Sequence, residues 1–117
     1  MTEGEQYLTQ AERELNAASA ARTGGNAGKM RVCARRAAGA AITWLLLRHP
    51  CPGWGTDAVT QLLHLQNDPG FSQEARDAAK RLTLRISADF TYPSSGDPIE
   101  DARAIIHAIT AKMNAVV

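Results

Sequence analysis

Six basic side chains lie in a stretch of the chain that contains no acidic residue. No Asp or Glu occurs between Leu15 and Thr56, although the whole chain has a net charge of only +1. The basic residues of this stretch are Arg22, Lys29, Arg31, Arg35, Arg36 and Arg48. Cationic side chains gathered on one face attract phosphates and acidic proteins. We therefore predict a binding surface on one helix for RNA, a nucleotide-like ligand or an acidic partner. Its residues are Lys29, Arg31, Arg35 and Arg36.

A structural role for the same arginines is the alternative. Arg31 and Arg35 are four residues apart and share a helix face, where acids of the preceding helix can pair with them. The candidate acids are Glu12 and Glu14. An arginine near the middle of a bundle can also form a buried ion pair, which fixes packing. Nucleic-acid binders usually add stacking aromatic side chains, yet aromatic residues make up only 5% of this chain.

Arg103 and His107 form a second candidate site, because they are four residues apart on a predicted helix and share a face. An imidazole can act as general base in attack on a phosphodiester while a guanidinium stabilises the charge that develops. The pair therefore predicts metal-independent cleavage of RNA. The alternative is that His107 is an ordinary surface histidine.

The remaining chemistry-bearing residues predict neither a metal site nor a cofactor. His49 and His64 have no neighbour at metal-ligand spacing. The glycines around Gly24 lack the spacing of a phosphate loop, and no serine or cysteine nucleophile motif is present. Two cysteines cannot make a disulfide scaffold, and we expect Cys33 to be buried and Cys51 to be an exposed free thiol.

Apolar residues recur every three or four positions through most of the chain, which is typical of amphipathic helices. Glycine, proline and asparagine clusters separate these segments, and the first helix is expected to end at Gly24 and Gly25. The pattern predicts helices over about residues 4–22 and 27–48, a short helix capped by Thr56, a longer helix after Ser72 and a last helix from Pro98. We therefore predict one all-α domain over residues 1–117, a four- to five-helix up-and-down bundle.

Residues 82–92 carry two conflicting signals. Apolar and polar residues alternate strictly from Leu82 to Tyr92, which is typical of a strand. Strong helix formers lead directly into this segment from Gln73 to Arg81, and no other segment offers a partner strand. We therefore predict that the helix continues through Phe90.

Few large side chains are available for the core, because much of the apolar fraction is alanine. The expected anchors are Tyr7, Leu15, Trp44, Leu45, Leu62, Leu63, Leu82, Ile86, Phe90, Ile99, Ile106 and Ile109. Trp54 lies in a loop with proline and glycine, and we expect it either to fold back over the core or to lie on a dimer or ligand surface. The small residues of the second helix should allow another helix to approach closely.

The first residues are acidic and polar, unlike the basic and then apolar start of a secretory signal. The longest apolar run, Trp44 to Leu47, is too short to span a bilayer. We therefore expect a cytoplasmic protein with no membrane segment.

The order of these elements resembles the HEPN family (higher eukaryotes and prokaryotes nucleotide-binding domain). The matching segments are Tyr7–Leu15 in the first helix, Arg35–Ala41 in a second helix that ends before a Pro/Gly loop, a short Leu-rich helix, a helix closing on Tyr92-Pro93, and Pro98–Ile106 in the last helix. The resemblance covers nearly the whole chain. It implies a small helical bundle, commonly a homodimer, that either cleaves RNA or partners a nucleotidyltransferase.

The chain departs from the pattern of the ribonuclease members of that family. Those members use an Arg and a His separated by four to six residues, and no arginine stands at that distance before any of the three histidines. Thr91 occupies the position before Tyr92-Pro93 where many relatives carry Arg.

Family active sites often lie near the end of the third long helix, and this adds Arg85 to the catalytic candidates Arg103 and His107. An ordinary ion pair between Arg85 and Asp89 is the alternative.

The missing Arg–His spacing favours a non-catalytic HEPN-like module that is dimeric and binds a partner protein or a nucleotide-like ligand. Two alternatives stay open. One is a divergent HEPN ribonuclease that acts on RNA, and the other is a generic helical protein–protein interaction domain.

Overall fold

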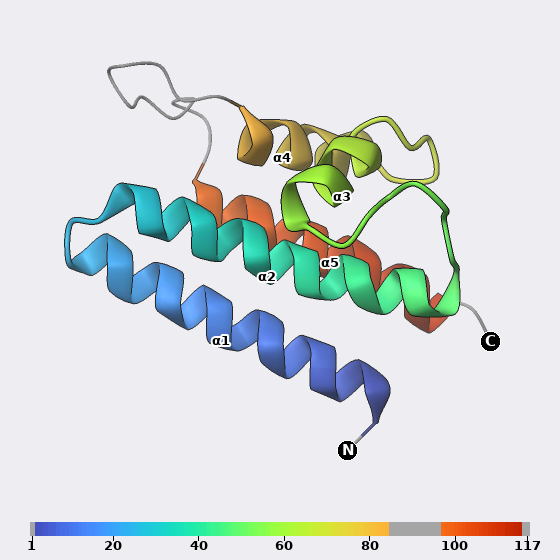
Figure 1. Ribbon diagram of the computed structural model, residues 1–117, viewed down its shortest axis with the longest axis horizontal. Helices are drawn as coiled ribbons and strands as arrows, with labels where there is room; N and C mark the ends of the chain where they lie inside the picture. The colour runs from blue at the N-terminus through green and yellow to red at the C-terminus, as the bar shows by residue number, and fades with distance from the viewer. Residues whose placement is uncertain (1, 85–96, 116–117) are drawn as a thin grey trace.

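The computed structural model describes residues 2–84 and 97–115, which fold into helices joined by loops (Figure 1). The helices are α1 (Glu3–Thr23), α2 (Ala27–Arg48), α3 (Ala58–Leu65), α4 (Gln73–Thr83) and α5 (Pro98–Ala115). The described residues contain no strand, so the all-α prediction is confirmed for them. No helix in these ranges is long and apolar enough to cross a membrane.

Side-chain caps fix the first residues of α3 and α4. Ser72 caps α4 as predicted, because its hydroxyl accepts a hydrogen bond from the Ala75 amide at 3.2 Å. The predicted cap of α3 is wrong by one residue. Asp57, not Thr56, is the N-cap, and its carboxylate accepts from the Thr60 amide at 2.9 Å.

The turn between α1 and α2 and the start of α5 agree with the sequence signals. Gly25 has φ +77°, a conformation that glycine adopts without steric cost, and it allows the chain to reverse between the two helices. Pro98 is the first residue of α5, and the Asp97 carboxylate accepts from the Ile99 amide at 2.9 Å.

The predicted continuation of the helix beyond α4 is wrong at Leu84. This residue has φ −62° and ψ 137°, which is extended backbone. The Thr83 hydroxyl donates to the carbonyls of Ala79 and Lys80, at 3.0 and 3.1 Å. A side chain therefore provides hydrogen bonds to carbonyl groups in the last turn of α4. Most of the alternating segment, with Arg85 and the expected anchors Ile86 and Phe90, lies outside the described residues.

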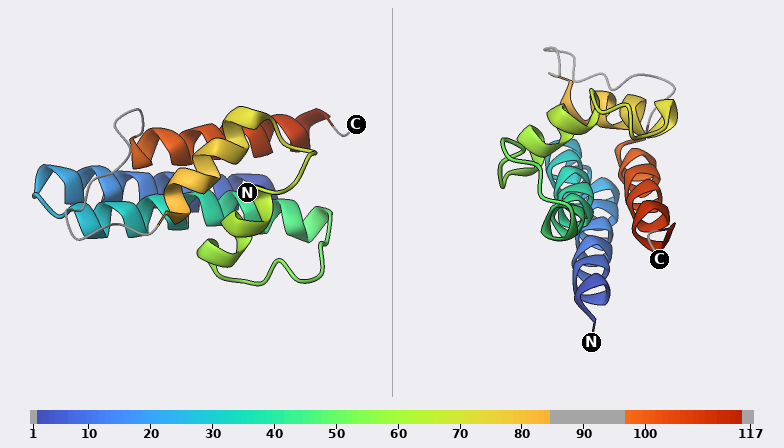
Figure 2. Two further views of the ribbon diagram at one scale, coloured as in Figure 1. Left: turned by 90° about the horizontal axis from the view of Figure 1, so that it is seen from above. Right: turned by 90° about the vertical axis from the view of Figure 1, so that its right-hand side faces the viewer.

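The four longer helices run alternately up and down (Figures 1 and 2). An ion pair of 2.9 Å between Arg22 and Asp97 places the end of α1 beside the start of α5. Arg81 and Asp101, at 2.8 Å, place the end of α4 there too. Trp44 and Met113 line one hollow, so the final turns of α2 and α5 lie together at the opposite end. Helices α3 and α4 cover one side of α2 and α5, and α1 lies on the other side (Figure 2).

Small residues form the seam along which α2 packs. Four alanines of α2 have no exposed surface: Ala34, Ala37, Ala38 and Ala41. At Gly39 a Cβ atom would lie only 2.9 Å from the Cβ of Ala58. The expected close approach of another helix is therefore confirmed, and that helix is α3.

Most of the expected anchors in the described ranges are buried, and Leu63 is the clear error. It is 43% exposed, because α3 turns Leu62 and Leu65 inward and Leu63 toward solvent. Trp54 is only 9% exposed, so it folds back over the core. The two cysteines behave as predicted, one buried and one exposed.

Candidate functional site

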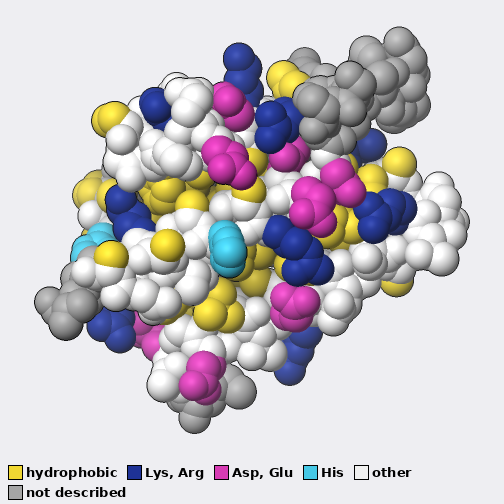
Figure 3. Space-filling view, turned by 180° about the vertical axis from the view of Figure 1, so that it is seen from behind, with side chains coloured by type: hydrophobic (Ala, Val, Ile, Leu, Met, Phe, Trp, Pro, Cys, Tyr) yellow, Lys and Arg dark blue, Asp and Glu magenta, His cyan; other side chains and the backbone are white. Residues whose placement is uncertain are grey.

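The four basic residues predicted to form one surface lie in different surroundings. Lys29 and Arg36 are exposed and Arg35 is half-buried, whereas Arg31 keeps only 8% of its surface exposed. On the back of the molecule, basic and acidic side chains are interleaved (Figure 3). The structure does not bring the four residues into one exposed patch, and a role in binding stays a prediction.

Arg35 and Arg36 leave α2 in different directions, about 100° apart, because they are consecutive on a helix. Arg35 donates to the carbonyl of Leu82 at 3.3 Å and so ties α2 to the end of α4. Arg36 lines a hollow that it shares with Glu14 of α1. Arg35 therefore helps to hold α2 against α4, whereas Arg36 lies at the surface.

Sequence reasoning missed a buried ion pair between α4 and α5. Both oxygens of Asp101 accept from Arg81, with Nε at 3.0 Å and Nη2 at 2.8 Å from the carboxylate. The Asp101 side chain is only 7% exposed. A bidentate pair of this kind orients two helices more strictly than apolar contact does. The available signal was the position of Asp101, one residue before Ala102 and four before Ile105, within the buried stripe of α5.

Arg103 and His107 do share a face of α5, as predicted, and both are exposed. With Glu12 and Leu15 of α1 they line a hollow of about 370 Å³ between the two helices. The Nη1 of Arg103 lies 4.0 Å from a carboxylate oxygen of Glu12, so an acid competes for the guanidinium. The third catalytic candidate, Arg85, lies outside the described residues, and catalysis by these residues stays a prediction.

The solvent side of α2 carries two exposed large apolar side chains. We call the α2 stripe the residues spaced by four, four, three and four positions along this side, namely Val32, Arg36, Ala40, Thr43 and Leu47. Val32 is 37% exposed and Leu47 is 53% exposed.

A shallow hollow lies over the middle of the α2 stripe, between α1 and α3. Its volume is about 280 Å³. Gln10 and Glu14 of α1 form one wall, and Thr56 and Gln61 form the other. Gln61 is held there by its amide, which donates to the Thr43 hydroxyl at 3.4 Å and to the Gly55 carbonyl at 3.3 Å. Gly39 and Ala40 of α2 also line the hollow, at its floor, between these polar walls. We call this feature the α2 hollow.

The described residues hold no group of three His, Cys, Asp or Glu side chains that could bind a metal ion. The pKa of one carboxyl group, at the cap of α3, is clearly shifted. Hydrogen bonds from the Thr60 amide and then from its hydroxyl lower the pKa of Asp57 below its ordinary value of 3.8. This carboxylate serves helix α3 and faces no candidate site.

No family model, curated protein or solved structure matches this chain.

Proposed function

We propose that the chain is a non-catalytic, HEPN-like helical module that pairs with a second copy of itself through the α2 stripe. The observation that carries the proposal is the exposure of two large apolar side chains, Val32 and Leu47, on the α2 stripe. Helices α1, α3 and α5 all pack against α2. The α2 stripe is the part of its surface that they leave open, and there Leu47 projects into solvent with 53% of its surface exposed.

The α2 stripe carries both a projection and a hollow, which suits pairing about a two-fold axis. Leu47 projects from it, and the α2 hollow lies over Ala40, about two helical turns away. If two α2 helices cross in opposite directions about Thr43, Leu47 of each copy meets the hollow of the other. Such a contact occurs twice in the dimer, so one substitution removes two contacts.

Charge on the walls of the α2 hollow is compatible with the same pairing. Arg36 and Glu14 both line the hollow, so each copy offers one cation and one anion. A two-fold arrangement lets these groups meet opposite charges across the interface without leaving a surplus of either sign.

Light scattering at several concentrations tests the proposal. We expect the particle mass to approach twice the chain mass of 12.6 kDa as concentration rises. Leu47→Glu should hold the mass at that of one chain, because the charge would be buried without a partner. Ala111→Glu is the matched control, since Ala111 is also exposed but lies on α5. A wild-type mass of one chain at every concentration would remove the proposal.

The second candidate function is RNA cleavage, and the shared hollow of Arg103 and His107 is what favours it. It requires cleavage of structured RNA by the wild-type chain and its loss in His107→Ala. Under our proposal, structured RNA stays intact on long incubation with either protein.

A further inference from the structure

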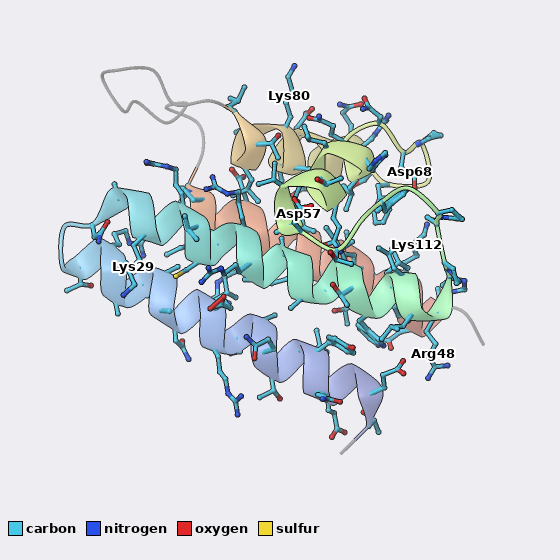
Figure 4. The ribbon with its side chains drawn as sticks, in the orientation of Figure 1. Lys29, Arg48, Asp57, Asp68, Lys80 and Lys112 are labelled. Carbon is cyan, nitrogen blue, oxygen red and sulfur yellow. The ribbon has the colours of Figure 1, made fainter. Side chains whose placement is uncertain are left out.

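A cavity of about 320 Å³ lies at the end of the bundle where α2 and α5 finish. Segments far apart in the sequence enclose it: the last turns of α2 and α5, the loop after α2 and the turn before α4. Lys112 and Asp68 mark this end, and Lys29 marks the opposite one (Figure 4). A volume of this size matches the lower range of small-molecule sites. We call it the aromatic cavity.

The walls of the aromatic cavity are apolar and include two large rings. Leu45, Trp54 and Phe71 all line it, and they are 4%, 9% and 5% exposed. An apolar lining with a few polar groups at the edge is the usual composition of a site for a small organic ligand. Two aromatic side chains favour a ligand that is itself aromatic, because ring–ring contacts add to the area buried.

Both rings are held in place before any ligand arrives. Trp54 stacks on His64 with 5.7 Å between ring centroids and 16° between planes. Its amide also donates to the Cys51 carbonyl at 3.2 Å. The Nζ of Lys112 lies 4.9 Å from the centre of the Phe71 ring. Preformed walls lower the entropy lost when a ligand binds.

The polar edge of the cavity includes one ammonium group, Lys112, and one carboxylate, Asp68. The Nζ of Lys112 donates to the Gly70 carbonyl at 2.9 Å, and no carboxylate of the described residues lies within 4.0 Å of it. An ammonium group has three donors, so two remain for a ligand. The Asp68 carboxylate accepts from the Gly70 amide at 2.8 Å, so the spare donors of Lys112 are the part of this edge that can hold a ligand carboxylate.

We propose that the aromatic cavity binds a small aromatic carboxylate, with its ring against Trp54 and Phe71 and its carboxylate on Lys112. The site is separate from the α2 stripe, and binding there does not depend on self-association.

Fluorescence of Trp54 provides the first test. The chain has two tryptophans, so Trp44→Phe leaves Trp54 as the only one. Three probes share one ring and differ in charge: phenylacetate, phenethyl alcohol and phenethylamine. We expect phenylacetate to bind with a dissociation constant of roughly 1 mM, as suits a ligand of this size. The alcohol and the amine should bind about tenfold more weakly, because they lack the charged hydrogen bond to Lys112.

Cys51 provides a second test that needs no change at Trp44. It lines the cavity and is exposed, whereas Cys33 is buried, so a thiol reagent labels the folded chain at Cys51. We expect phenylacetate to slow this labelling, and phenethylamine at the same concentration to slow it much less.

Variants of Lys112 test whether its ammonium group binds the carboxylate of the ligand. Lys112→Met should weaken phenylacetate binding about tenfold. Lys112→Arg should retain it, and Lys80→Met, an exposed lysine on α4, is the matched control that should bind like the wild type. Equal affinity for the three probes, or for Lys112→Met and wild type, would overturn the carboxylate assignment. No response to phenylacetate in either the fluorescence or the labelling experiment would overturn the site itself.

Discussion

Apolar residues lie on two sides of α2 but meet different surroundings there. On the inner side, Ala34 and Ala38 have no exposed surface. On the outer side, Val32 and Leu47 keep 37% and 53% of theirs. Apolar composition alone therefore does not say which side of a helix is covered within one chain. The side left uncovered is where we place the contact with a second copy.

Removing the buried carboxylate that pairs α5 with α4 should have the largest effect on the free energy of unfolding. Asp101→Ala leaves Arg81 without its bidentate partner, and the Arg81 side chain is 27% exposed. We expect a loss of about 2–3 kcal/mol in the free energy of unfolding, below the range for a fully buried pair because water reaches the arginine. Urea denaturation measures it. Glu3→Ala breaks the exposed pair with Arg48 and should cost less than about 1 kcal/mol. Equal losses would show that burial of the Arg81 pair has no consequence.

Enlarging one alanine on each side of α2 tests the comparison directly. Ala38→Leu should destabilise the fold by about 1–3 kcal/mol, because its site is fully packed. Ala40→Leu enters the α2 hollow and should change stability by no more than about 0.5 kcal/mol. The same change should weaken self-association, since it fills the space proposed for Leu47. Thermal unfolding and light scattering separate the two effects. A stable Ala38→Leu variant would contradict the close packing of the inner side.

Two glycines of α2 give a finer comparison. A Cβ at Gly39 would lie 2.9 Å from the Ala58 Cβ, whereas a Cβ at Gly28 would lie 3.8 Å from the Asn26 Oδ1. Gly39→Ala should therefore cost about 1 kcal/mol, the helix preference of alanine offsetting part of the overlap. Gly28→Ala should stabilise the chain by about 0.5 kcal/mol. The check is a pair of urea denaturation curves, and a stabilising Gly39→Ala would mean that α3 sits farther from α2 than described.

The cap of α3 should give the smallest effect, visible only in acid. The pKa of Asp57 is lowered in the folded state, so its contribution is present above the ordinary value of 3.8 and is lost as pH falls through the folded value. Asp57→Asn keeps an N-cap side chain and removes this titration. Melting temperatures should therefore fall less steeply with acidification in the variant than in the wild type. An NMR titration that places the Asp57 pKa at or above 3.8 would contradict the hydrogen bonding at this cap.

Local signals predicted the helices well, and contacts between helices were harder to foresee. The bounds of α2 and the Ser72 cap follow from neighbouring residues, so the sequence is sufficient for them. Leu63 was misplaced because periodicity in an eight-residue helix does not say which apolar side faces the core. The partner of Asp101 was missed because it is twenty residues away and depends on the packing of α4 on α5.

The basic residues show the same limit. A count of charges along α2 predicted one surface, but burial separates Arg31 from the exposed Lys29 and Arg36. The α2 stripe was not recognised in the sequence, because Val32 and Leu47 look like any other apolar residues of a buried helix.

Backbone NMR spectra of the wild-type chain at low and high concentration test the central claim most directly. The account predicts concentration-dependent shifts along the α2 stripe, from Val32 to Leu47, and in the facing residues of α1 and α3. Amides on the exposed side of α4 should keep their positions. Spectra that do not change with concentration, or shifts gathered on α4 and α5 instead, would contradict pairing through α2.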